Sequence, residues 1–470
     1  QDNSIANQDS NVAVSQDLLA ENDCNGTGGN DVTCTIDANS QVNEIRPIDQ
    51  FNTANVAGTV SSVQFNDVAV AQTAAMANTC DETGGGINQA TCENIGDINV
   101  LGPVSQSNGV DALNSDTASQ SNGAQIAQNL DVVNDCDEDG TGFNLAGCAA
   151  SALNEITPND GITQNNDAIV GDDTAQLNFV GIIQDAQVDN VCDETGLGDN
   201  AALCASAAEN GIGLISQAND AQGSGDADFT QNNNIPAINQ VGTAQSDCDQ
   251  SDEQTAEGDN SGTCAASAEN GIESITQTND ATGTHVDDIF QDNTGAFSQV
   301  ATSNNGCDAT TFSFSGDNNA VCASAAENTI GPVAQTNTAT GNDDVLLDQD
   351  NNVAMTQDAS ANNDCDATAQ NDAICAAAAE NEIESITQTN EATGDDFASI
   401  LQSNDAVIVQ NVDALNSCDE SGDGSDAATC TSDADNFFGF VGPIAQTNTA
   451  TGGDQSTASQ SNGAQITGIS

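Results

Sequence analysis

Sixteen cysteines are the side chains with the clearest chemistry in this 470-residue sequence, and they fall into eight close pairs. The pairs are Cys24/Cys34, Cys80/Cys92, Cys136/Cys148, Cys192/Cys204, Cys248/Cys264, Cys307/Cys322, Cys365/Cys375 and Cys418/Cys430. Zinc motifs favour two cysteines separated by two to four residues, and these gaps are longer. An even count with one pair per repeat predicts eight local disulfides and an oxidising compartment. Closing each loop stabilises the fold by roughly 3 kcal/mol in the chain-entropy model.

Carboxylates next to the cysteines are the second group with possible chemistry. An aspartate follows the first cysteine of seven pairs, and Gly and Thr lie close by. Calcium binds carboxylate and carbonyl oxygens in loops of this composition, although the spacing is not that of an EF-hand. The candidate ligands are Asp137, Glu138, Asp139, Asp193 and Glu194. The alternative is an acidic surface that is screened diffusely. We therefore expect no required cofactor, with Ca²⁺ as the one candidate ion.

Catalysis finds little support in the sequence. His285 is the single histidine, and a lone histidine is more often a surface residue than a general base. Carboxylate pairs occur in every repeat, whereas an active site would be singular. No glycine-rich phosphate loop is present. We expect a protein that is not an enzyme, with one glycosylation sequon at Asn25.

The formal net charge is −72, and Arg46 is the single basic residue apart from the histidine. Nucleic acid binding is excluded because nothing would neutralise the phosphates. Anionic membrane surfaces are disfavoured for the same reason, and no run is long and apolar enough to insert into a bilayer. The sequence begins at Gln1, with neither a Met nor an apolar signal region. This start predicts a mature secreted protein at the cell surface or outside the cell.

A repeated pair of Gln-x-Asn-x-Ala-like segments is the framework that must position these residues. The first glutamines of the pairs are Gln50, Gln106, Gln164, Gln217, Gln277, Gln335, Gln388 and Gln446. A second glutamine follows after 14 residues in seven of the eight pairs. Around both, polar and apolar residues alternate with period two, which is typical of strands. Repeats of 53–60 residues predict a solenoid or array.

We therefore predict an all-β fold: a β-solenoid of about eight repeats, each with one disulfide loop. Residues 1–23 are interpreted as an incomplete N-terminal repeat, and residues 24–470 as one elongated domain. The Ala-rich segment after each second cysteine favours helix by propensity, but we expect strand. The sequence leaves open whether each repeat forms one large coil or two smaller ones.

Stacked coils would place each Gln and Asn about 4.8 Å above its equivalent. Side-chain amides can then form hydrogen-bonded ladders like those of cross-β structures. The strand pairs, best seen in residues 400–416, resemble the curlin-type repeats of extracellular amyloid fibre subunits. This resemblance implies a β-solenoid with a role in extracellular fibres. The present repeats differ because they are more than twice as long, carry a cysteine pair and lack basic residues.

The first functional hypothesis is a secreted subunit that polymerises head to tail, as a homopolymer, into a filament or sheath. No terminal repeat of different sequence covers either end, so the stack would expose unpaired backbone groups there. The alternative is a calcium-dependent adhesin or surface-layer module that uses the acidic Cys-Asp loops. A third hypothesis is ice binding through outward threonines such as Thr387 and Thr389.

Overall fold

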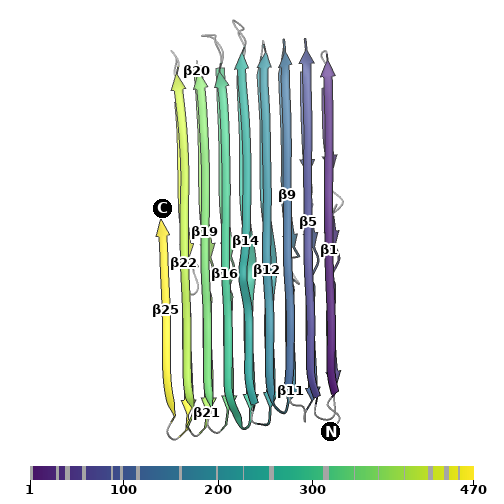
Figure 1. Ribbon diagram of the computed structural model, residues 1–470. Helices are drawn as coiled ribbons and strands as arrows, with labels where there is room; N and C mark the ends of the chain where they lie inside the picture. The colour runs from purple at the N-terminus through teal and green to yellow at the C-terminus, as the bar shows by residue number, and fades with distance from the viewer. Residues whose placement is uncertain are drawn as a thin grey trace.

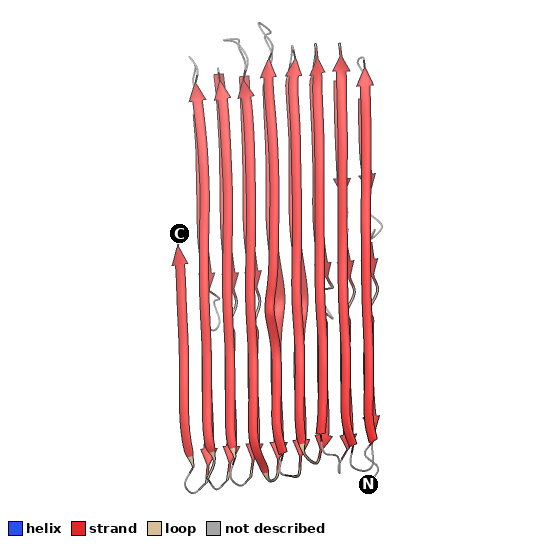
Figure 2. Cartoon of the chain, in the orientation of Figure 1, coloured by secondary structure: helices blue, strands red, loops and turns tan. Residues whose placement is uncertain are grey.

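The chain folds into two long, parallel sheets that face one another (Figure 1). The computed structural model describes residues 4–27, 31–37, 43–55, 60–85, 88–95, 99–112, 117–157, 161–196, 199–225, 227–252, 259–310, 317–342, 345–368, 370–395, 397–421, 427–438, 444–453 and 456–469. Figure 2 shows that nearly all of this part of the chain is strand. The expected all-β solenoid is confirmed.

The long-strand sheet contains nine parallel strands, eight of them 23 to 26 residues long. In spatial order they are β1 (Ser4–Thr27), β5 (Val60–Gly84), β9 (Thr117–Gly140), β12 (Asp173–Gly196), β14 (Ala227–Asp252), β16 (Val286–Thr310), β19 (Leu346–Thr368), β22 (Ser399–Ser421) and β25 (Thr457–Ile469). The spatial order equals the chain order, so each repeat adds one strand to the stack.

The return sheet carries the chain back and contains sixteen shorter strands. They are β2 (Asp31–Asp37), β3 (Asn43–Ile45), β4 (Ile48–Asn55), β6 (Asn88–Ile95), β7 (Asn99–Leu101), β8 (Val104–Ala112), β10 (Asn144–Ile156), β11 (Ile162–Val170), β13 (Asn200–Gly223), β15 (Asn260–Gly283), β17 (Asp317–Ile330), β18 (Val333–Gly341), β20 (Gln370–Ile383), β21 (Ile386–Gly394), β23 (Ala427–Phe438) and β24 (Ala445–Gly452). One long strand and its return strands form one coil, so the described chain contains eight coils and β25. Each repeat is one large coil.

Proline accounts for several breaks in the return sheet. Pro47, Pro103 and Pro332 lie between consecutive return strands of their coils. Proline has no backbone N–H to give to a neighbouring strand, so a strand tends to end there. β13 and β15 contain no proline and run unbroken for 24 residues. Pro236 lies inside β14, where the register with β16 shifts between Ile235 and Ile238, as expected of a bulge.

Alternation of side chains between two faces builds the interior. On β12 the inward side chains include Ile182, Ala186 and Cys192, all buried, while neighbours such as Ile183 face outward. Equivalent positions repeat in every coil, which produces separate columns of Ile and Val, of Ala, and of cysteine. Small and β-branched residues suit two closely spaced sheets, which explains why the chain needs no Trp or Tyr.

Two sequence expectations are resolved by these elements. The Ala-rich segments after the second cysteines are strands, as in β13 and β20, rather than helical turns. The boundary expected at residues 23/24 falls inside β1, so residues 4–23 belong to the first strand of the first coil. Across the described ranges, no helix has the length and apolar character needed to cross a membrane.

Candidate functional site

A column of glutamines runs through the return sheet from β4 to β24. Its members are the eight predicted ladder residues Gln50, Gln106, Gln164, Gln217, Gln277, Gln335, Gln388 and Gln446. From Gln106 onward, each Nε2 donates a hydrogen bond to Oε1 of the glutamine in the preceding coil, at 2.7–2.9 Å. Two further columns, which include Gln64 and Gln72, follow the same rule in the long-strand sheet. The predicted ladder is present.

Asparagine columns connect the two sheets as well as the coils. Asn122 Nδ2 donates to Oδ1 of Asn166 in the opposite sheet and to Oδ1 of Asn178 in the next coil, both at 3.0 Å. The glutamine donors point toward the N-terminal end of the stack, whereas the asparagine donors point toward the C-terminal end. The two kinds of ladder therefore have opposite polarity. Each buried amide depends on its neighbours in adjacent coils for its hydrogen bonds.

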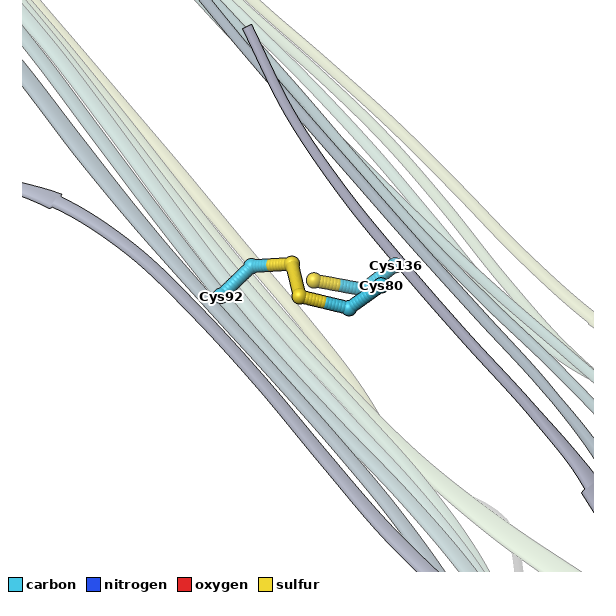
Figure 3. A group of neighbouring side chains, drawn as sticks. All are labelled: Cys80, Cys92 and Cys136. Carbon is cyan, nitrogen blue, oxygen red and sulfur yellow. A yellow bond between two sulfur atoms is a disulfide. The ribbon is translucent and has the colours of Figure 1, made fainter. Parts of the chain in front are cut away.

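The disulfides form another interior column. All eight predicted pairs are bonded, and each joins the long-strand sheet to the return sheet with a Cα–Cα distance of 6.2–6.6 Å. Figure 3 shows the Cys80–Cys92 disulfide with Cys136 of the next coil beside it. The expectation of one local disulfide per coil is confirmed.

The five candidate calcium ligands do not converge on one point. Asp137 and Asp139 are exposed on the outer face of β9, and Asp193 lies on the outer face of β12. Glu138 and Glu194 are buried between the sheets. Adjacent residues of a strand point to opposite faces, so Asp137 and Glu138 cannot share an ion. These residues therefore belong to two separate columns, with the aspartates on the outer face and the glutamates between the sheets, and they do not form one site.

The outer column places the aspartates that follow the cysteines in register. Its described members are Asp81, Asp137, Asp193, Asp249, Asp308 and Asp366. Burial and the neighbouring carboxylates, beginning with Asp249, raise the pKa of Asp193 to about 6. The same causes raise the pKa of Asp308 to about 6. A cation between such carboxylates would relieve the repulsion.

The inner column consists of Glu82, Glu138 and Glu194 in three successive coils, and Gln250 follows in the fourth. Burial, and then Glu82, raise the pKa of Glu138 to about 7. Burial, and then Glu138, raise that of Glu194 to about 9, although Glu194 Oε1 accepts a 2.6 Å hydrogen bond from the Ala146 N–H. A protonated glutamic acid has nearly the shape of glutamine. At neutral pH, the raised pKa values of Glu138 and Glu194 therefore favour protonated side chains at these two positions.

The remaining candidates lie apart from these columns. Asn25, the expected glycosylation residue, is exposed near the end of β1. His285 lies in the turn between β15 and β16 with a φ of 66°. Thr387 faces outward and is exposed, and Thr389 faces outward and is partly exposed. The structure gathers none of them into the interior columns.

No protein-family model, curated protein or solved structure matches the chain. Sequence reasoning missed the inner glutamate column and the close approach of sulfurs between coils. Strict alternation places Glu138 on the same face as Cys136, so the sequence could have revealed the glutamate column. The approach of the sulfurs depends on how far one sheet is shifted relative to the other, which no sequence spacing specifies.

Proposed function

We propose that this protein is a secreted structural subunit that polymerises head to tail into an extracellular filament or sheath. The observation that carries the proposal is the pair of uncovered strand edges at the ends of the long-strand sheet. Within the described ranges, β1 pairs only with β5, and β25 pairs only with β22. Long free edges are templates for further strands, and this stack already repeats such pairing in every coil.

The ladders end in complementary atoms. At one end, Gln8 Nε2 donates to the Thr53 carbonyl at 3.1 Å and retains a second N–H. At the other end, Gln460 Nε2 donates to Gln402 Oε1, and Gln460 Oε1 has no donor among the described residues. Gln8 and Gln460 occupy equivalent positions of the repeat. Docking of one copy on the next would therefore continue the column with its polarity unchanged.

The outer strands also match in polarity and charge. In the register that stacks Gln8 on Gln460, Val14 meets Ile466, which is 56% exposed although its equivalent Ile408 is buried. On the outer face, Asp9 would meet Ser461, so no carboxylate lies directly opposite another between β1 and β25.

Compartment and charge fit the same role. Eight disulfides are typical of proteins from oxidising environments. A net charge of −72 repels approaching copies, so assembly requires enough salt to screen it.

Electron microscopy and light scattering of the purified chain at rising salt test the proposal. We expect Ser461→Asp, which places a carboxylate opposite Asp9 of the next copy, to slow filament growth at least tenfold at about 0.1 M salt. Ser461→Asn, which has the shape of the aspartate variant without its charge, should assemble normally, and Asp9→Asn should rescue Ser461→Asp. Discrete monomers of the unmodified chain at every salt concentration would contradict the proposal.

The outer aspartate column favours a second candidate, a calcium-dependent adhesin or surface-layer module. Aligned carboxylates such as Asp137 and Asp193 repeat at strand spacing and would bind hard cations. Calorimetry on EDTA-treated protein should then show saturable Ca²⁺ uptake that Asp193→Asn weakens. Heat signals that are absent or never saturate would remove this candidate.

A further inference from the structure

The sulfur atoms form a zigzag that continues from coil to coil. Cys92 of the return sheet is bonded to Cys80 of its own coil. Its Sγ also approaches Cys136 of the next coil, and the three sulfurs lie within 4.8 Å of one another (Figure 3). Cys92 thus sits between two long-strand cysteines, with one covalent partner and one close neighbour.

The same arrangement recurs along the stack. Sulfur groups within 4.8 Å also join Cys148 to Cys192, Cys204 to Cys248, Cys322 to Cys365, and Cys375 to Cys418. The return-sheet sulfurs lie 3.3–3.9 Å from the carbonyl oxygen that directly precedes the long-strand cysteine of the next coil. This holds for Cys34, Cys92, Cys148, Cys204, Cys264, Cys322 and Cys375. The offset between the sheets is therefore uniform through all seven steps.

We propose that this column is a thiol–disulfide relay, in which a thiol pair created at one coil separates and migrates through the stack. Exchange needs a thiolate close to a disulfide sulfur, and the sulfur groups supply that neighbour at five of the seven steps between coils. At the other two steps, Cys34 and Cys264 make the same carbonyl contact to the next coil. In the rearranged pairing, each return-sheet cysteine is bonded to the long-strand cysteine of the next coil and no longer to that of its own coil. Complete migration gives seven disulfides between coils and two thiols, at Cys24 and Cys430.

The entry point is the Cys418–Cys430 disulfide, because Cys430 is exposed whereas Cys365 and Cys375 are buried. A water-soluble phosphine reduces this bond by two electrons, gives two thiols and leaves as its oxide. The Cys418 thiol loses its proton, and the thiolate attacks Cys375 Sγ. The Cys418–Cys375 bond forms, the Cys375–Cys365 bond breaks, and the electron pair leaves on Cys365.

The next step repeats the chemistry one coil further. The Cys365 thiolate attacks Cys322 Sγ and releases Cys307, which takes up the proton. Each step breaks one disulfide and forms one, so the relay consumes no further reductant. Two electrons that enter at Cys430 thereby place a thiol deep in the buried column, which no reagent reaches directly. The relay operates within one chain and does not require the proposed filament.

Partial reduction followed by thiol mapping tests the relay. Full-length protein is treated with one equivalent of phosphine at a pH of about 8.5, where free thiols ionise, and is then alkylated with N-ethylmaleimide. Digestion beside carboxylates and non-reducing mass spectrometry locate labels and disulfides. We expect most molecules labelled at Cys430 to carry their second label outside Cys418, together with Cys375–Cys418 peptides.

Two variants that each lack one disulfide provide a matched comparison. Cys365→Ser with Cys375→Ser interrupts the zigzag next to the entry point, so both labels should remain on Cys418 and Cys430. Cys24→Ser with Cys34→Ser removes a disulfide at the far end and should leave migration from Cys430 unchanged. Circular dichroism checks that both variants keep their strands. Labels restricted to the two cysteines of one coil in the unmodified protein would overturn the proposal.

Discussion

At the scale of the residue, the fold depends on buried side-chain amides such as that of Asn178, which both donates and accepts hydrogen bonds. Asn178 donates to the Ala218 carbonyl and to Oδ1 of Asn219 and Asn233, and it accepts from two further asparagines. Such a residue is stable inside a dry interior because each coil supplies partners to the next. One lost amide therefore leaves unpaired groups in three coils.

We expect Asn178→Ala to lower the free energy of unfolding by about 3 kcal/mol, because buried donors lose their acceptor. Asn129→Ala, on the exposed outer face of the neighbouring strand β9, should change it by less than about 0.5 kcal/mol. Urea unfolding followed by circular dichroism measures both. Equal effects of the two substitutions would show that the ladder contributes nothing specific.

The inner glutamates predict a dependence of stability on pH. The folded state raises the pKa of Glu138 to about 7 and that of Glu194 to about 9, whereas the unfolded values are near 4.5. Folded protein then binds more protons than unfolded protein between these values, so their contribution to stability is complete at low pH. It should decline as pH rises from about 4.5 through 7 to 9.

Thermal melts of the unmodified chain between pH 5 and 9 should show this decline. The double substitution Glu138→Gln and Glu194→Gln should flatten it, because glutamine extends the column that Gln250 already continues. Asp137→Asn on the outer face is the control and should leave most of the slope. A double variant with the original slope would contradict protonation of these side chains.

At the scale of the element, sequence alternation predicted which side chains face inward. Gln64 and Gln72 are both buried on the inward face of β5, but a single strand of 25 residues was not foreseen. The calcium ligands failed as a single group because Asp137 and Glu138 are adjacent in one strand. The sequence also left open whether each repeat forms one coil or two. A 14-residue offset between glutamines fits a turn that joins the two sheets, and it fits a turn inside one sheet equally well.

Insertions test the strand as a rigid unit. Inserting one Ala between Ala186 and Gln187 in β12 would turn Asn190, Cys192 and Glu194 outward, so we expect failure to form the Cys192–Cys204 disulfide and a large loss of stability. The same insertion between Gln254 and Thr255 should cost less than about 1 kcal/mol. Separations of 10 to 16 residues between paired cysteines already vary naturally. Peptide mapping and urea unfolding compare the two insertion variants. If both variants form the disulfide and are equally stable, the strand does not hold its residues in a fixed register.

At the scale of the whole molecule, eight equivalent coils and one further strand make a stack without a capping element in the described ranges. Apolar positions at its ends are incompletely covered, as Ile466 shows. The charge of −72 opposes association, and the matched ladder ends favour it. Assembly should therefore depend strongly on salt.

Cryo-electron microscopy of filaments grown at moderate salt tests the central claim most directly. Nine strands of the long-strand sheet, at about 4.8 Å each, predict an axial rise of about 43 Å per subunit, with continuous strand density across the joint. Discrete particles, or filaments whose subunits meet through the outer faces of the sheets, would contradict the account.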